Sequence, residues 1–284
     1  MSSTRVHPGL CAFVSASRAF ATNALAGAVI MLSGCGPLDQ ADTVPASSLM
    51  DIYRNDAETR KPAVAGQLEW TVRLNGCSGS MLNDKFLLTA AHCSPRVGSV
   101  WTSGACLAAS CTNDIRATRA VESNSALDYA ILEVSWTRPE SRVAQRYPPM
   151  VQTKDDQLTF GRDGVGTQIF TVGFPGDKTG AHHAVGTAKA YRGNSLIYNI
   201  GIINGNSGGA VWRTDNFMLV SQTNFGPRAL GQPGWNNNDP EDSRAWNGGG
   251  KMPAIYAASA TMRQIFPEGK NPLVDETGKL LPTN

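Results

Sequence analysis

Short β-type runs fill this chain from Gln67 onward, and they constrain its fold more than any other feature. Each run is rich in apolar, β-branched or aromatic residues and is bounded by Gly, Asn, Asp or Pro. The runs are LEWTVRL (68–74), KFLLTAA (85–91), DYAILEV (128–134), TQIFTVGF (167–174), SLIYNI (195–200), GAVW (209–212) and FMLVSQT (217–223). This pattern is typical of an all-β sandwich or barrel. The one helix-period segment, YAASATMRQIF (256–266), is stopped by Pro267 and predicts a helix near the C-terminus.

The size and charge of the chain exclude some classes of protein. With 284 residues, of which 41% are hydrophobic, it is long enough to bury one large core or two packed halves. Its formal net charge is +2, and it contains no block of basic residues of the kind that marks a nucleic-acid surface. We therefore expect a globular, enzyme-sized protein that does not bind nucleic acid.

The first 34 residues resemble a bacterial lipoprotein signal peptide. Arg5 and Arg18 are their only charged side chains, and AFATNALAGAVIML (19–32) is a short, nearly apolar run. LSGC (32–35) is similar to a lipobox, so we expect cleavage before Cys35 and lipidation of that cysteine. The alternatives are an ordinary signal with an incidental cysteine and a spanning helix, but the latter needs roughly 20 apolar residues.

Two further segments lack apolar periodicity. Residues 35–66 are polar and contain prolines, which predicts a lipid anchor followed by a tether, with room for a short amphipathic helix at 49–53. The folded domain is then expected over 67–284. Residues 226–251 form a second run rich in Gly, Asn, Asp and Pro, and such a long loop is either functional or an ordinary surface insertion.

The cysteines are typical of an exported protein. After cleavage and lipidation an even set remains, consisting of Cys77, Cys93, Cys106 and Cys111. Four cysteines allow three pairings, and proximity in sequence favours Cys106 with Cys111, which leaves Cys77 with Cys93. A zinc site is the competing use, but no spacing is Cys-x-x-Cys and no histidine completes a ligand pair, so we expect no metal.

Three residues together provide the groups that acyl transfer needs. Ser207 lies within GNSGG, where glycines permit a sharp turn that brings backbone amides near a reacting carbonyl. Asp128 directly precedes a buried run, and His92 ends the apolar stretch FLLTAAHC. Each residue alone has an ordinary structural explanation. A nucleophilic hydroxyl, however, needs a base and a carboxylate that orients the base, and the chain contains all three.

These motifs resemble the signature segments of chymotrypsin-fold serine proteases. The segments are LLTAAHC, DYAILEV and GNSGG, in the order His, Asp, Ser. FTVGFPGDK (170–178) and YNIGIINGNSGG (198–209) are similar to stretches of the bacterial glutamyl endopeptidases, and the resemblance extends from Gln67 to Phe266. It implies two six-stranded antiparallel β-barrels with a C-terminal helix.

The resemblance also implies a role for each residue. Ser207 would be the nucleophile, His92 the general base and then acid, and Asp128 the group that fixes the imidazole tautomer. The backbone amides of Gly205 and Ser207 would form the oxyanion hole, and Cys77 would pair with Cys93. Asn206 stands where trypsin-like enzymes have an aspartate that pairs with a new N-terminus, so activation through that ion pair is not expected.

The side chain before the scissile bond would enter an uncharged pocket. By resemblance it would be lined by Gly201, Ile202, Thr223, Asn224, Phe225 and Gly226. Glutamyl enzymes have a hydroxyl near position 202 and a histidine on the strand aligned with QTNFG, and both are missing here, so an apolar or small side chain is favoured over glutamate. Only a charged or basic side chain that entered the pocket from a loop would change this preference, and the candidates are Arg228 and the pair His182 and His183. We expect that pair in a solvated loop.

The sequence thus predicts an exported serine endopeptidase that acts through an acyl-enzyme on protein or peptide substrates without a cofactor. We expect a monomer in the bacterial cell envelope, held on a membrane by lipidated Cys35, facing the periplasm or the surface, or released from it. Two alternatives remain. One is a catalytically silent lipoprotein that uses the same fold for binding. The other is an esterase, for which a strand-to-helix elbow at Ser207 would be diagnostic.

Overall fold

The computed structural model describes residues 60–160, 166–226 and 247–282. The predicted signal peptide (1–34), lipidated Cys35, the helix at 49–53 and residues 227–246 of the long loop lie outside the described residues. Within the described residues, no helix is both long enough and apolar enough to span a membrane.

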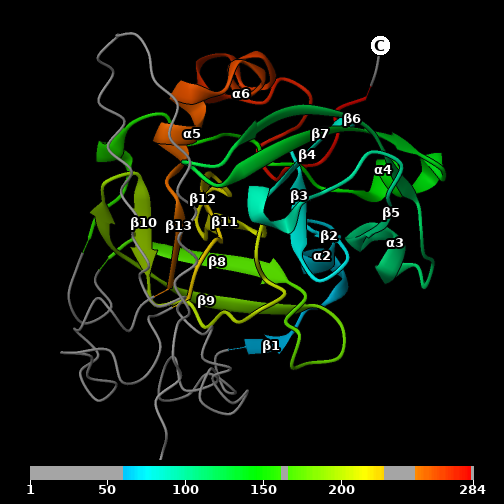
Figure 1. Cartoon of the computed structure of the whole chain (residues 1–284), viewed down its shortest axis with the longest axis horizontal. Helices are drawn as coiled ribbons and strands as arrows, with labels where there is room; N and C mark the ends of the chain where they lie inside the picture. The colour runs from blue at the N-terminus through cyan, green and yellow to red at the C-terminus, as the bar shows by residue number, and fades with distance from the viewer. Residues whose placement is uncertain (1–59, 161–165, 227–246, 283–284) are drawn as a thin grey trace, which may run out of the picture. The chain divides into compact units, whose positions relative to one another are not determined.

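Six antiparallel strands form a closed barrel. They are β2 (Val72–Arg73), β3 (Ser78–Met81), β4 (Phe86–Thr89), β5 (Val100–Ser103), β6 (Ile115–Asn124) and β7 (Tyr129–Trp136), joined in the order β2-β3-β4-β7-β6-β5. Apolar side chains of β4 and β7 face each other across the ladder, as in the pair Leu87 and Leu132, and both are buried. Figure 1 shows these strands at the upper right. This barrel confirms one half of the predicted architecture.

The second half is a curled sheet of seven strands rather than a closed six-stranded barrel. Its strands are β8 (Gln168–Gly173), β9 (His182–Arg192), β10 (Ser195–Tyr198), β11 (Ala210–Arg213), β12 (Leu219–Gln222), β13 (Asn247–Gly250) and β1 (Arg60–Pro62). The order is β12-β11-β8-β9-β10-β13, and β1 pairs with β9. Because β1 belongs to the sheet, the predicted tether (35–66) extends too far, and the fold begins before Gln67.

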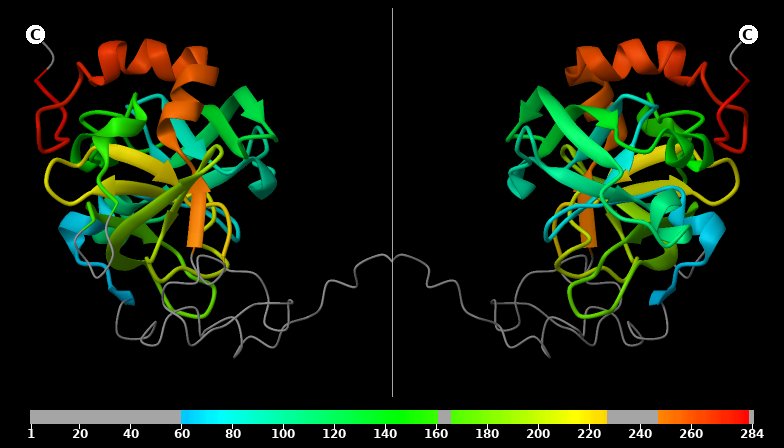
Figure 2. Two further views of the ribbon diagram at one scale, coloured as in Figure 1. Left: turned by 90° about the vertical axis from the view of Figure 1, so that its left-hand side faces the viewer. Right: turned by 90° about the vertical axis from the view of Figure 1, so that its right-hand side faces the viewer.

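The helices are short. They are α2 (Ala65–Leu68), η1 (Ala91–Cys93), α3 (Gly104–Ala108), α4 (Pro139–Ala144), η2 (Asp155–Gln157), α5 (Met252–Ala258), α6 (Ala260–Ile265) and η3 (Pro267–Gly269). The predicted C-terminal helix (256–266) is present but broken at Ser259, whose hydroxyl accepts a hydrogen bond from the Met262 amide at 3.0 Å and so caps α6. Figure 2 shows α5 and α6 at the top of the domain in both views.

Aromatic side chains pack the two halves together. Trp70, just before β2, lies 5.7 Å from Trp212 of β11 between ring centroids. Trp212 in turn stacks on Phe170 of β8 at 5.2 Å. Both tryptophans are almost fully buried. This shared core holds the two sheets in a fixed relation, so residues from both can contribute to one site.

Candidate active site

His92 is held by Asp128 through two hydrogen bonds. The imidazole Nδ1 lies 2.7 Å from Asp128 Oδ2, and the His92 amide donates to Asp128 Oδ1 at 2.9 Å. His92 lies in η1 after β4, and Asp128 directly precedes β7, the neighbour of β4 in the barrel. Since a carboxylate only accepts hydrogen bonds, Nδ1 carries the proton, which leaves Nε2 able to act as a base.

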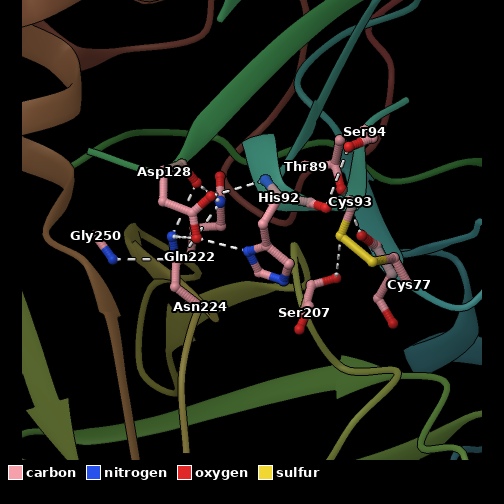
Figure 3. Close-up of polar contacts among 11 residues, drawn as sticks. Cys77, Thr89, His92, Cys93, Ser94, Asp128, Ser207, Gln222, Asn224 and Gly250 are labelled. Atoms are coloured by element: carbon pink, nitrogen blue, oxygen red, sulfur yellow. Dashed lines mark hydrogen bonds and ion pairs between the residues drawn. A yellow bond between two sulfur atoms is a disulfide. The ribbon is translucent and has the colours of Figure 1, made fainter. Parts of the chain in front are cut away.

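Asp128 is itself oriented by Gln222 of β12 and by Asn224, which follows that strand. Asn224 Nδ2 donates to Asp128 Oδ2 at 2.8 Å and to its carbonyl oxygen at 2.8 Å. Gln222 Nε2 donates to the same carbonyl at 2.9 Å. Figure 3 shows both amides beside the carboxylate. Asn224 was predicted to line the substrate pocket, but its side chain binds Asp128, a role that the sequence did not reveal.

Ser207 lies in the loop between β10 and β11. A strand stands on either side of this loop, and no helix directly follows Ser207. An α/β-hydrolase requires a strand-to-helix elbow at its nucleophile, so the alternative of an esterase with that elbow is wrong. Figure 3 shows Ser207 on the side of the imidazole opposite Asp128. No hydrogen bond joins Ser207 Oγ to His92 among the described contacts. Catalytic hydrogen bonds commonly tighten only when substrate binds.

The glycines around Ser207 have backbone conformations that other residues rarely adopt. Gly205 has φ of 98° and Gly208 has φ of 83°. A Cβ atom at Gly205 would overlap the Phe174 carbonyl, and one at Gly208 would overlap the Ser78 carbonyl. The predicted need for glycine at both places therefore has two causes, the positive φ and the close approach of backbone.

The backbone amides of Gly205 and Ser207 have no hydrogen-bond acceptor among the residues that the structure describes. The Gly176 amide donates to the Asn204 carbonyl at 2.7 Å. Because N–H and C=O point in opposite directions across a trans peptide, the Gly205 amide points away from Gly176. Within the part of the chain that the structure describes, neither the Gly205 nor the Ser207 amide donates a hydrogen bond. Two such donors near a nucleophile can stabilise an oxyanion.

Ser78 connects this loop to the closed barrel. Its buried hydroxyl accepts a hydrogen bond from the Phe174 amide at 2.9 Å and donates to the Gly205 carbonyl at 2.8 Å. Its own amide donates to the Ser207 carbonyl at 2.8 Å. Ser78 was not predictable from the sequence, because a serine in a strand carries no signal of such contacts.

The predicted pocket residues come from two segments that meet at Ser207. They are Gly201, Ile202, Thr223, Asn224, Phe225 and Gly226, and none is charged. The second segment lies against the Ser207 loop, because the Gly208 amide donates to the Thr223 carbonyl and the Thr223 amide donates to the Gly209 carbonyl, each at 2.7 Å. The Thr223 hydroxyl accepts from the buried Tyr198 hydroxyl at 3.3 Å, and burial raises the pKa of that phenol.

His182 and His183 lie in β9 rather than in the expected solvated loop. They pair with Pro62 and Lys61 of β1. Burial, followed by the charge of Lys61, lowers the pKa of His183. His183 lines a hollow of about 380 Å³ with Trp70 and Phe217, which is not the hollow beside Gly205. Arg228 lies outside the described residues.

Both predicted disulfides are confirmed. Cys77 pairs with Cys93 at a Cα–Cα distance of 6.2 Å, and Cys106 pairs with Cys111 at 4.9 Å. The Cys93 sulfur lies 3.6 Å from the Ser207 carbonyl oxygen. A disulfide sulfur has no proton to donate, so this is a packing contact. Cys77, His92 and Cys93 have potential metal-ligand atoms within 4.8 Å of one another, but the disulfide removes the two thiolates that a metal would need.

Comparison with known proteins shows which proteins this chain is similar to. Residues 77–219, half of the chain, match the family described as trypsin-like peptidase domain. A Glu endopeptidase solved in complex with MPD is similar in structure, with a TM-score of 0.50 and 19% identity over 70% of this chain and 94% of that chain. Kallikrein-related peptidase 10, solved in complex with Zn²⁺, has a TM-score of 0.48 and 14% identity over 73% and 100%. No curated protein sequence matches.

Proposed function

Because this chain belongs to the trypsin-like peptidase family, we propose that it is a serine endopeptidase that hydrolyses peptide bonds through an acyl-enzyme. The observation that carries the proposal is the His92–Asp128 pair, with Nδ1 and Oδ2 2.7 Å apart, facing Ser207 from the other half of the fold. The backbone amides of Gly205 and Ser207, which donate to no acceptor among the described residues, also support acyl transfer because they could stabilise an oxyanion.

In the first half-reaction, Ser207 Oγ attacks the scissile carbonyl while His92 Nε2 takes the hydroxyl proton. Asp128 keeps the imidazole in the required tautomer and stabilises the imidazolium that forms. The negative charge on the carbonyl oxygen is stabilised by the amides of Gly205 and Ser207. Collapse of this intermediate breaks the C–N bond, and His92 donates its proton to the leaving amine.

In the second half-reaction, water replaces the amine. His92 removes a proton from the water, whose oxygen attacks the acyl carbon of the Ser207 ester. The same two amides stabilise the second oxyanion. The C–O bond to Ser207 then breaks, the serine oxygen regains its proton from His92, and a carboxylic acid product leaves.

The preferred side chain before the scissile bond is apolar or small. Gly201, Ile202 and Thr223 are buried, and the side chain of Asn224 binds Asp128. A charged substrate side chain in contact with these residues would lose water without gaining an ionic partner. This supports a preference against glutamate, although the fold is shared with a Glu endopeptidase.

We also propose that the protein is exported and anchored on a membrane by lipidated Cys35, and that it acts as a monomer in the cell envelope. The lipobox-like LSGC after an apolar run supports the anchor. The two disulfides support an oxidising compartment.

Replacing the nucleophile tests the proposed activity. The experiment compares the full-length wild-type protein with Ser207→Ala and with a control, Ser125→Ala, which changes an exposed serine in a turn. Each protein is assayed for hydrolysis of a peptide mixture and for labelling by a fluorophosphonate. Ser207→Ala should lose about 10⁴ to 10⁶ in turnover and all labelling, whereas the control should keep both. Labelling that persists in Ser207→Ala would refute the assignment. A folded wild-type protein that neither hydrolyses nor labels would favour the catalytically silent binding protein.

A further inference from the structure

A buried ion pair links the start of the described chain to the loop beside Gly205. Arg60 of β1 donates from Nη1 to Asp177 Oδ1 at 2.7 Å and from Nη2 to Asp177 Oδ2 at 3.0 Å. The side chains are only 3% and 10% exposed, respectively. Burial alone would raise the pKa of Asp177, but the hydrogen bonds and charge of Arg60 outweigh it and hold the pKa below its ordinary value. The carboxylate is therefore charged and fixed in orientation at neutral pH.

Asp177 lies in a turn that also contains Gly176. The Lys178 amide donates to the Pro175 carbonyl at 3.2 Å, which makes Gly176 and Asp177 the two central residues of a β-turn. This turn follows β8, whereas Arg60 lies on β1 at the outer edge of β9 (Figure 1). The side chain of one central residue is thus held by β1, and the backbone of the other is free to bind elsewhere.

The backbone of Gly176 binds the peptide that contains the Gly205 amide. The Gly176 amide donates to the Asn204 carbonyl at 2.7 Å. Rotation of the Asn204–Gly205 peptide would break this bond and would reverse the direction of the Gly205 amide. Ser78 Oγ holds the following carbonyl, that of Gly205, at 2.8 Å. The Gly205 amide is therefore oriented from both sides, and the Gly176 side depends on the turn.

We infer that Arg60 is a positioning residue for the oxyanion hole, acting through Asp177 and Gly176 on the Gly205 amide. The inference rests on the proposed function, because it assigns Arg60 to the same site. It adds a requirement that the catalytic motifs do not contain: the segment before the first barrel must stay paired on β9 for full turnover.

The test compares Arg60→Gln and Asp177→Asn with a matched control, Arg146→Gln. Arg146 also forms a partly buried ion pair, 2.9 Å from Glu69, but none of its hydrogen bonds reaches the Ser207 loop. All variants are made in the full chain. The measurements are kcat and KM for one peptide substrate, thermal unfolding, and hydrogen exchange of the Gly176 amide.

An oxyanion donor acts only on the transition state, so a misplaced one lowers kcat and leaves KM unchanged. Loss of a whole donor costs about 10²- to 10³-fold in kcat. Arg60→Gln and Asp177→Asn should therefore lose about 10- to 100-fold in kcat with KM within about twofold, and the Gly176 amide should exchange faster. Arg60→Lys should recover part of the loss. The double variant should lose no more than either single one, because both act through the same contact.

Unchanged kcat in Arg60→Gln would overturn the inference, as would an equal loss in Arg146→Gln, since the effect would then reflect general stability. If a variant unfolds at the assay temperature, Arg60→Lys is used for the test instead. A lowered kcat in Arg60→Lys, with the Gly176 amide exchanging its hydrogen at the wild-type rate, would overturn the inference. A folded wild-type protein without activity would instead refute the proposed function, before any variant is compared.

Discussion

Gly205→Ala separates the catalytic role of this position from its conformational one. Gly205 has φ of 98°, and an added Cβ would overlap the Phe174 carbonyl and lie 2.9 Å from the Gly176 nitrogen. Gly98 has a similar φ of 87°, but a Cβ there meets nothing within 4 Å. Gly98→Ala is therefore a matched control that has the backbone strain without the displacement.

The two variants should differ in stability by a modest amount. The positive φ costs each alanine variant about 1 to 3 kcal/mol. Only Gly205→Ala must also push backbone aside, at a further cost of about 1 to 3 kcal/mol. For a domain of this size each kcal/mol lowers Tm by roughly 2 to 4 °C, so both variants should remain folded at room temperature.

The two variants should differ far more in turnover. Displacing the Gly205 amide removes one oxyanion donor, which corresponds to about 3 to 4 kcal/mol of barrier, or about 10²- to 10³-fold in kcat. Gly98→Ala should keep wild-type kcat. The assay is hydrolysis of one peptide substrate, with circular dichroism to confirm folding. A folded Gly205→Ala variant with kcat within threefold of wild type would show that the oxyanion hole is elsewhere.

Two further predictions concern Asp128 and the anchor. Asn224→Ala removes two hydrogen bonds to Asp128 and should lower kcat by about tenfold, the equivalent of about 1.4 kcal/mol, with little change in KM. Unchanged kcat would show that the hydrogen bonds from His92 and Gln222 are enough to orient Asp128. Cys35→Ser should move the protein from the membrane fraction to the soluble fraction, because several acyl chains are needed for stable anchoring, and its retention with membranes would contradict the lipobox interpretation.

Strands with a continuous apolar run were predictable from the sequence, and the exposed ones were not. β4, β7, β8 and β12 coincide with predicted runs because their side chains are mostly buried. β6 and β9 were missed, since most of their residues are exposed or partly exposed and several are charged. Their strand conformation comes from pairing with β7 and β8, which a local pattern does not show.

β13 is the clearest case of tertiary control. Its sequence, NGGG, has almost no strand propensity, and residues 226–251 were expected to be a loop. It pairs with β10, and a Cβ at Gly249 would overlap the Gln222 carbonyl. Glycine is needed there because two backbones approach closely, so the residue that weakens a strand elsewhere permits this one.

The sequence by itself predicted the catalytic groups and the constraints within short segments. His92, Asp128 and Ser207 were recognisable because each lies in a motif, and the disulfides followed from a small even set of cysteines. Only the tertiary structure decided which residues contact Asp128 and the turn beside Gly205. Arg60 and Asp177 are 117 residues apart, and Asn224 is 96 residues from Asp128. The Asn224–Asp128 contact depends on how the two sheets pack through a shared core, and the Arg60–Asp177 contact depends on the pairing of β1 with β9 in the second sheet. Both are properties of the whole chain rather than of any segment.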